Sequence, residues 1–432
     1  MPLIQTKGAG SAQGFGLFTK PAAKTTSWLG SFGDSGTNYG YAVTFNSSGN
    51  VYLAGNNSNP DFQLVKYNST GVVQWQKSLD SGGNDYGRAV DVDSADNIYV
   101  CGTTNDYDTQ IVKYNSSGVV QWQRRLSNGF NDSTGYAIAI DSSDNVLIGG
   151  YYNLSGTYGF QTTKYNSSGA LQWQRRLVGT NAIGYGIAVD SSNNVYITGQ
   201  IASKIQIAKY NSAGTIQWQR SLAGSSVDDR GRAVAVDSSG NIYICGDSYP
   251  ATKYRLQLAK YNSSGTIQWQ RTLSDTNSSY GLSIAVDSSS NIYVSGGYEV
   301  SPAAYDVIIA KYNSSGTIQW QRGLAVVGAY ATADFASGIA VDNAGKFSFN
   351  GHFNSGGTIK FLFAKLPDDG TLTGAYAVGS DTFTYSTTTL TDAASTLTDA
   401  ATTLTDSAST LTDASTSYTA ATTTFTSTVT NI

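Results

Sequence analysis

The chain has 432 residues, a formal net charge of −4, and charged side chains at only 13% of its positions. This length can bury a large core, and the abundant Gly, Ser, Thr, Asn and Tyr favour short strands and tight turns over long helices. The sequence has no basic block to follow the phosphates of a nucleic acid and no apolar run long enough to span a bilayer, so we expect neither a nucleic-acid partner nor membrane insertion.

The first residues, MPLIQTKGAGSAQGFGLF, contain no basic start followed by an apolar stretch. We therefore expect no secretion signal at this end. We interpret residues 1–17 as an extended docking segment that precedes the folded part of the chain.

Residues 18–380 contain a unit that recurs with a period of roughly 45 to 55 residues, the range of a four-stranded propeller blade. One copy reads RAVAVDSSGNIYICG, then a variable stretch, then LQLAKYNSSGTIQWQRTL. Each copy predicts four short strands, here AVAVD, NIYIC, LQLAKY and TIQWQR, which we name a to d. The a–b and c–d links, DSSGN and NSSG, carry the Asx and Gly residues of tight hairpins. The a–b turn recurs seven times, so the sequence predicts an all-β, seven-bladed propeller of antiparallel blades; the turns lie at Asn46, Asp93, Asp141, Asp190, Asp237, Asp287 and Asp342.

All seven tryptophans occupy one position of strand d. A bulky indole at a fixed strand position is expected to pack between neighbouring blades rather than to stack on a ligand, and the Lys and Arg beside it are expected to be solvated. These blade-packing residues are Trp28, Trp75, Trp122, Trp173, Trp218, Trp269 and Trp320. The last copy has Gly374 where Trp belongs, so we predict that the Trp28 strand completes the seventh blade against Phe361–Lys365 and closes the ring.

Residues for chemistry are scarce, because His352 is the only histidine and Glu299 the only glutamate. A nucleophile beside its base, or a transition-metal site, cannot be built from these parts. We therefore expect no enzymatic activity, no cofactor and no metal. Cys101 and Cys245 fill the same position in copies that are not neighbours, so we expect two buried thiols rather than a disulfide.

These units resemble bacterial and viral β-propeller repeats whose blades carry AVDSSGNIYVTG followed by AKYNSSG. The resemblance covers about Gly30 to Lys365 and is most specific in the turns Asp237–Asn241 and Asn262–Gly265. It implies a seven-bladed propeller and no particular activity, because such repeats are scaffolds for many tasks.

The copies differ in their b–c and d–a loops, which share one face of a propeller, whereas the uniform turns share the other. These loops are rich in Tyr, which offers a rigid ring with a polar tip, and in Asn, Asp and Ser. They suit a host-surface glycan or a protein partner; the alternative is an ordinary polar rim. The candidate binding residues are Tyr107, Tyr151, Tyr152, Tyr158, Tyr249, Tyr254, Tyr298, Tyr305 and Tyr330.

Residues 387–432 repeat every seven positions, in units such as TLTDAAS. Because seven is odd, a plain strand would place the large residues on alternating faces, whereas a helix would gather them in one stripe. We therefore predict a coiled-coil stalk that makes a homo-oligomer, with a trimer favoured; the alternative is a flexible linker. The predicted oligomerisation residues are Leu390, Leu397, Leu404, Leu411, Tyr418 and Phe425.

A rigid disc with a thin heptad tail resembles tailed-phage appendages such as tail, neck or head fibres, and IQTKGAGSAQGFGLFTK is similar to the start of small structural proteins of these phages. The resemblance implies a virion structural protein that contacts other virion proteins or attaches to a host. One alternative is a secreted or surface-exposed bacterial lectin or adhesin. Another is a glycan-degrading enzyme, which would need a carboxylate pair such as Asp228 and Asp229 with a raised pKa.

Overall fold

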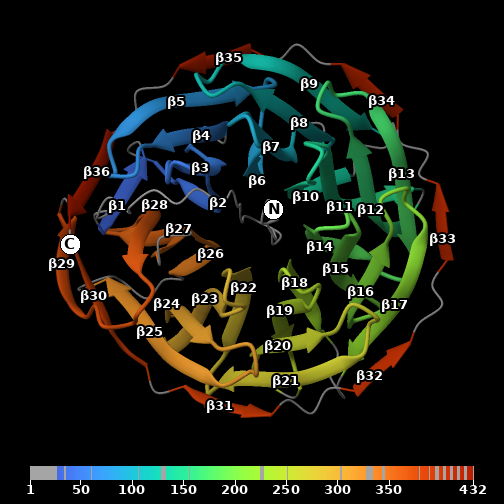
Figure 1. The fold of residues 1–432 in the computed structure, drawn as a ribbon. Coiled ribbons are helices and arrows are strands. Elements are labelled where there is room, and N and C mark those ends of the chain that lie inside the picture. Colours follow the sequence, from blue (N-terminus) through green and yellow to red (C-terminus); the bar gives the residue numbers. More distant parts are fainter. Residues whose placement is uncertain are drawn as a thin grey trace.

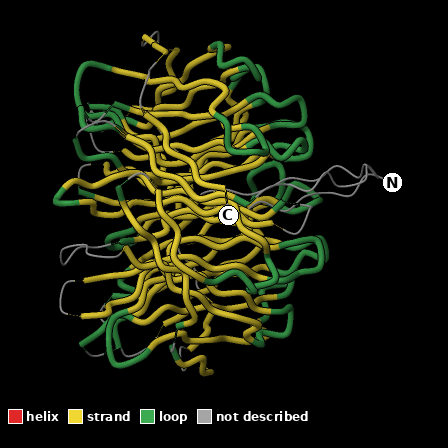
Figure 2. Tube along the Cα trace, turned by 90° about the vertical axis from the view of Figure 1, so that its left-hand side faces the viewer, coloured by secondary structure: helices red, strands yellow, loops and turns green. Residues whose placement is uncertain are grey.

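The computed structural model is a ring of seven antiparallel sheets around a central axis (Figure 1). It describes residues 27–431 apart from 34–35, 60, 106, 128–132, 155, 224–227, 251, 302–303, 327–333, 343–345, 379, 389 and the stretches 395–397, 402–404, 409–411, 416–418 and 423–425. Viewed edge-on, the strands run between loops that gather at two opposite faces (Figure 2). None of the described residues forms a helix that could cross a membrane.

Each sheet is one blade and contains strands a to d in order from the axis outward. The a strands are β2 (Tyr39–Phe45), β6 (Tyr86–Val92), β10 (Ser133–Ile140), β14 (Ile183–Val189), β18 (Arg230–Val236), β22 (Ser279–Val286) and β26 (Phe335–Val341). The b strands are β3 (Val51–Asn56), β7 (Ile98–Thr103), β11 (Val146–Leu154), β15 (Val195–Ile201), β19 (Ile242–Ser248), β23 (Ile292–Ser301) and β27 (Lys346–Ser355).

The outer half of each blade follows the same scheme. The c strands are β4 (Phe62–Tyr67), β8 (Thr109–Tyr114), β12 (Thr157–Tyr165), β16 (Lys204–Tyr210), β20 (Arg255–Tyr261), β24 (Ala304–Tyr312) and β28 (Thr358–Pro367). The d strands are β5 (Val73–Asp80), β9 (Val120–Ser127), β13 (Leu171–Val178), β17 (Ile216–Ala223), β21 (Ile267–Ser274), β25 (Ile318–Val326) and β1 (Trp28–Gly33). The b strands are buried along nearly their whole length because neighbouring blades cover both of their faces, which explains their continuous apolar sequence.

The ring closes between the two ends of the repeat region. Strand β1 pairs antiparallel with β28, with Trp28 opposite Lys365, so the first strand of the chain is strand d of blade 7, the arrangement that the sequence predicts. The indole of Trp28 is 0% exposed and packs against Tyr67 and Phe363. Closure in this way leaves no strand edge open at the join.

Adjacent blades are joined by side chains of strands c and d that reach the next c–d turn. Trp122 Nε1 and Lys113 Nζ both donate to the backbone oxygen of Ser167, at 3.1 and 3.0 Å, and Arg124 donates to Gly169 O at 2.6 Å. The pairing of a Trp and a Lys on one carbonyl recurs at Ser116, Ser212, Ser263, Ser314 and Asp368. The expectation of solvated cations was therefore wrong: these Lys and Arg connect blades.

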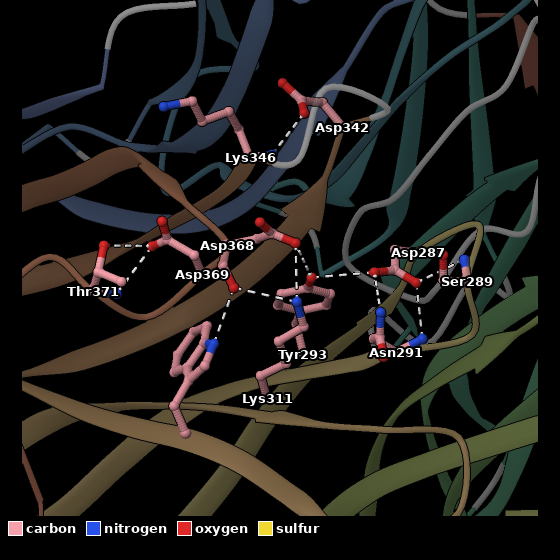
Figure 3. Close-up of polar contacts among 11 residues, drawn as sticks. Asp287, Ser289, Asn291, Tyr293, Lys311, Asp342, Lys346, Asp368, Asp369 and Thr371 are labelled. Carbon is pink, nitrogen blue, oxygen red and sulfur yellow. Dashed lines mark hydrogen bonds and ion pairs between the residues drawn. The ribbon is translucent and has the colours of Figure 1, made fainter.

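The join between blades 6 and 7 adds a carboxylate to this scheme (Figure 3). Asp287 accepts from the backbone N–H groups of Ser289 and Asn291, which shapes the a–b turn. Asp368 occupies the turn position that is Ser in other copies, and it contacts Tyr293 Oη and Lys311 Nζ, each at 2.9 Å. The Asp368 carboxylate therefore connects blade 7 to blade 6.

The tail forms strands rather than a helix in every segment of it that the structure describes. After the hairpin of β29 (Gly374–Val378) and β30 (Asp381–Thr387), six short strands follow: β31 (Thr391–Ala394), β32 (Thr398–Ala401), β33 (Thr405–Ala408), β34 (Thr412–Ser415), β35 (Thr419–Thr422) and β36 (Thr426–Asn431). From β30 to β36, each pairs antiparallel with the d strand of one blade, in the order 6, 5, 4, 3, 2, 1 and 7.

We call β30–β36 the belt, because these strands encircle the ring and β36 ends beside β29 (Figure 1). One heptad advances the chain by one blade, and the register repeats: Ala394 lies opposite Arg271, Ala401 opposite Arg220 and Ala408 opposite Arg175. Seven extended residues reach at most about 25 Å, which suits a step between the outer edges of neighbouring blades. The period of seven therefore has a structural reason other than a coiled coil.

The predicted helical stalk is thus not what the described tail residues form. Leu390 is 4% exposed and packs in the core cluster of blades 3 to 6, which contains Leu273 and Ile308. The other predicted oligomerisation residues, Leu397, Leu404, Leu411, Tyr418 and Phe425, lie outside the described residues, as does the segment 1–17. Oligomerisation stays a prediction, with no described helix to carry it.

Candidate functional site

An irregularity at the start of every a strand shapes the centre of the variable face. In all seven blades the a–b register skips one residue, a β-bulge that follows a glycine in six blades and Ala336 in the seventh. A bulge adds local twist and redirects the side chain of the extra residue. The skipped residues are Tyr41, Arg88, Tyr136, Tyr185, Arg232, Leu282 and Ser337.

Five of these residues contact one another from blade to blade, and we call them the inner ring: Tyr41, Arg88, Tyr136, Tyr185 and Arg232. The Arg88 guanidinium lies 4.5 Å from the Tyr41 ring centre and 5.7 Å from that of Tyr136. The Tyr136 and Tyr185 rings are 5.4 Å apart, and Arg232 lies 5.0 Å from Tyr185. Since the a strands are innermost in their blades, these contacts run around the propeller axis (Figure 1).

A second set of rings continues the inner ring through blades 1, 7, 6 and 5. Tyr39 stacks on Tyr41 with ring centres 6.1 Å apart and meets His352 at 5.0 Å. From there successive rings lie 4.7 to 6.0 Å from a neighbour. We call this set the aromatic arc: Tyr39, His352, Phe335, Tyr280, Tyr305, Tyr254 and Tyr249. All seven side chains are half-buried, so each is held by packing and still reached by solvent.

His352 belongs to the arc as a neutral ring. Burial lowers its pKa to about 4, so it is uncharged near pH 7. It therefore contributes an aromatic surface between Phe335 and Tyr39 rather than a cation.

The end of the arc on blade 5 is fixed by hydrogen bonds to Asp228. Its carboxylate accepts from Tyr254 Oη at 2.8 Å, from Gln200 Nε2 at 2.7 Å and from Arg230 Nε at 3.0 Å. Burial raises the pKa of Asp228, but the hydrogen bonds and the charge of Arg230 outweigh it, and the pKa falls below its usual value. Asp228 is therefore ionised near neutral pH and orients Tyr254, which does not suit the proton donor required by the enzyme alternative. Its neighbour Asp229 is fully buried.

Glu299 connects the loops of blades 5 and 6 beside the arc. It accepts from Lys253 Nζ at 2.7 Å and from the backbone N–H of Ser278 at 3.0 Å. The hydrogen bond from Lys253 holds the pKa of Glu299 below its usual value. The single glutamate thus anchors the loop that carries Tyr249 and Tyr254.

Two carboxyl groups lie next to the arc, the half-buried Asp306 and the buried Asp334, and sequence reasoning missed both. Burial raises the pKa of Asp306 to about 6 and that of Asp334 to about 7, although hydrogen bonds from Tyr298 and from the Asn354 N–H oppose the shifts. The negative charge of Asp306 raises the pKa of Asp334 further. Both groups can therefore exchange a proton near neutral pH, and they adjoin Tyr305 and Phe335 in sequence.

The structure places some of the predicted loop tyrosines in or near the rings described above and others elsewhere. Tyr249, Tyr254 and Tyr305 join the arc, and Tyr151 lies 5.9 Å from Tyr136 and 6.0 Å from Tyr158.

The remaining candidates are not members of the arc. Tyr152 is 1% exposed under the Arg176 guanidinium, which leaves it no ring surface for a ligand. Tyr298 is half-buried. Tyr107 stands 62% exposed at a loop tip with a φ of 55°, a strained conformation for a bulky residue, and Tyr330 lies outside the described residues.

The structure offers no evident metal site among the residues it describes, since no three His, Cys, Asp or Glu side chains come together there. Cys101 and Cys245 are free and fully buried, in blades 2 and 5. Burial raises the pKa of both thiols far above the usual value, so neither is a reactive thiolate.

Three stretches of the chain match the family described as Beta-propeller repeat (SBBP), at residues 80–108, 172–204 and 217–249. The chain is thus a β-propeller repeat protein. No curated protein matches it in sequence.

Solved structures similar in shape include a protein titled YCF48 bound to D1 peptide, with 10% identity, a TM-score of 0.48, and coverage of 81% of this chain and 99% of that one. Others are the polysaccharide lyase Uly1 (10% identity, TM-score 0.46, 85% and 100% coverage) and a protein of unknown function from Dyadobacter fermentans DSM 18053 (10%, 0.46, 80% and 98%). At this level of similarity the titles say nothing about ligand or activity here.

Proposed function

We propose that the protein is a non-enzymatic recognition protein that holds a glycan on the aromatic arc, and that it serves as an appendage of a phage particle that attaches to a host surface. The observation that carries the proposal is the continuity of the arc. Seven rings from four blades follow one another in contact, in stacked, tilted and T-shaped pairs, on the face where the repeats differ. A fold kept uniform elsewhere has no structural need for such a surface.

The chemistry of the arc suits a sugar. Half-buried tyrosine rings offer flat apolar faces to the C–H groups of a pyranose, and their hydroxyls can hydrogen-bond its oxygens. Tyr254 already donates to Asp228, which fixes its ring while leaving the hydroxyl oxygen able to accept. Little side-chain entropy remains to be lost when a ligand binds, because the rings are already held by packing.

Binding is tested with Tyr249→Ala and Tyr305→Ala on a glycan array and on host cells. We expect each change to weaken binding roughly tenfold or more, as for rigid aromatic contacts at an interface. Tyr376→Ala is the matched control, since Tyr376 is half-buried on β29 at the outer rim. If all three variants bind as well as the native chain, the arc does not bind a glycan, and the variable loops form an ordinary polar rim.

The virion role is tested by immuno-electron microscopy with an antibody against the propeller. Label on the appendages of purified particles is the expected result. Detection only in the medium or on the surface of bacteria, with no particles, would favour the bacterial lectin alternative.

A second candidate, a glycan-cleaving enzyme, is favoured by one observation: the raised pKa values of Asp306 and Asp334 beside the arc. A carboxyl that stays protonated near neutral pH can serve as a general acid. Release of reducing ends from a bound polysaccharide, lost in Asp334→Asn, would establish this activity in place of simple binding.

A further inference from the structure

Arg88 is held in a cage of tyrosine rings on the inner ring. Its guanidinium carbon lies 4.5 Å from the ring centre of Tyr41, 4.9 Å from that of Tyr86 and 5.7 Å from that of Tyr136. Aromatic faces attract a cation, and a guanidinium that stacks on rings keeps the N–H donors along its edge free. Tyr41 also hydrogen-bonds the guanidinium, so the cage fixes the position of the cation while its Nε–H stays without a partner.

Two other arginines at this face are already neutralised by the protein. Arg232 forms an ion pair with Asp247 at 2.8 Å, and the Asp247 side chain is 0% exposed. Arg230 pairs with Asp228. By contrast, no carboxylate of a described residue pairs with Arg88, and its buried Nε has no hydrogen-bond partner in the described structure.

A half-buried cation without a counter-charge is costly, and an anion supplied from outside offsets that cost. The position of Arg88 favours such a ligand, because Tyr41 is both a wall of the cage and the neighbour of Tyr39 at the end of the aromatic arc. A saccharide chain lying on the arc thus has a positive charge directly beyond its end.

We propose that the glycan held by this face is anionic and that its carboxylate or sulfate pairs with the edge of the Arg88 guanidinium. This inference rests on the proposed glycan-binding function and adds the chemical class of the ligand. A planar guanidinium can bind either group with two parallel hydrogen bonds, which gives selection for a charged sugar over its neutral counterpart.

The test is a glycan array that carries neutral, uronate-containing, sialylated and sulfated saccharides. We expect the native chain to retain acidic saccharides, and Arg88→Gln to bind them roughly 10- to 100-fold more weakly, as for the loss of a charge-assisted hydrogen bond. Comparison of the carboxylated and sulfated members distinguishes the two anions. Arg255→Gln is the matched control, because Arg255 is an exposed arginine on β20 outside the inner ring.

The outcomes separate this inference from the proposed function. Retention of neutral saccharides only, or undiminished acidic binding by Arg88→Gln, overturns the anionic ligand while glycan binding stands. Retention of nothing overturns both. If Arg88→Gln does not fold, the native chain is compared on each retained carboxylated saccharide and its methyl ester; equal binding to the two forms overturns the inference, and a loss with the ester supports it.

Discussion

The indole ring of Trp218, on strand d of blade 4, lies against Gly265 in the c–d turn of blade 5. A Cβ atom at Gly265 would stand 2.9 Å from Trp218 Cδ2, too close for an ordinary contact. The indole N–H also donates to Ser263 O in the same turn, at 3.2 Å. The repeated tryptophan and the repeated turn glycine are therefore two halves of one contact between blades, found again at Gly118 with Trp75, Gly169 with Trp122, Gly214 with Trp173, Gly316 with Trp269 and Gly370 with Trp320.

This contact predicts different costs for two glycines with the same backbone conformation. Gly265 and Gly240 have φ angles of 79° and 76°, but a Cβ at Gly240 would have no heavy atom nearer than 3.5 Å. Gly240→Ala should cost about 1 kcal/mol of the free energy of unfolding from backbone strain alone. Gly265→Ala should cost about 1–3 kcal/mol more, from overpacking against the indole. Urea unfolding measures both; equal losses would mean that the blades adjust without strain.

The raised pKa of Asp334 predicts an unusual dependence of stability on pH. Its folded pKa, about 7, lies above the ordinary aspartate value of 3.8, so the folded state binds the proton more tightly than the unfolded chain. This contribution to stability is complete below about pH 4 and is lost as the pH rises through 7, by up to about 4 kcal/mol. His352, with a pKa lowered to about 4, acts in the opposite sense, since its contribution is lost as the pH falls from about 6.5.

Asp334→Asn isolates the first effect, because the amide oxygen can still accept from the Asn354 N–H. We expect the variant to be more stable than the native chain at pH 8 and close to it at about pH 3.5, below the unfolded pKa, measured by chemical unfolding at both values. A constant difference between the two proteins across this range would show that Asp334 does not titrate as argued.

The propeller could be predicted from sequence because its turns are local. The carboxylate of Asp237 accepts from the backbone N–H groups of Ser239 and Asn241, all within five residues. The motif therefore contains the hydrogen bonds that stabilise its turn, and the turn can be predicted from the local sequence. Ring closure was also predictable, since Gly374 breaks the tryptophan pattern that Trp28 restores. The interblade role of the lysines was not, because Lys113 and its acceptor Ser167 are 54 positions apart.

The candidate site was only half visible in the sequence. Tyr249, Tyr254 and Tyr305 were predicted because they lie in loops whose sequence varies between the repeats. Tyr280 and Arg88 were missed because they lie in a strands, where the surrounding pattern indicates core. The available signal was a bulky or charged residue directly after the conserved glycine of strand a, as at Arg88 and Arg232, which a bulge makes accessible.

The expectation of a helical tail assumed one continuous element, and the stalk stays a prediction. An odd period alternates faces only along an unbroken strand. In the belt, four residues pair with a blade and three lead to the next, so each heptad begins a new strand in the same register. The abundance of Thr favoured strands from the start.

We expect that removal of the belt lowers both the stability and the solubility of the protein. A chain that ends at Thr388 lacks β31–β36, which leaves the outermost d strand of six blades with an unpaired edge. We expect its Tm to fall by roughly 5 °C or more and the protein to self-associate. Thermal unfolding followed by circular dichroism, with light scattering for the mass, measures both. An unchanged Tm in a monodisperse protein would show that the belt contributes nothing to the ring.

Leu390 distinguishes the belt from the coiled-coil stalk, because the two arrangements assign it different partners. In the belt it packs in the propeller core, and its backbone oxygen accepts from Gln321 Nε2 at 2.8 Å. Leu390→Ala should therefore cost about 2–4 kcal/mol of the propeller's free energy of unfolding, as for other buried leucines, with no change in molecular mass. Leu372→Ala, at a half-buried leucine near β29, should cost less than about 1 kcal/mol. A stalk would give the reverse for Leu390→Ala: a smaller mass by light scattering and an unchanged urea midpoint for the propeller. In a stalk, Leu390 would contact only other chains, so that result would support the coiled-coil stalk over the belt.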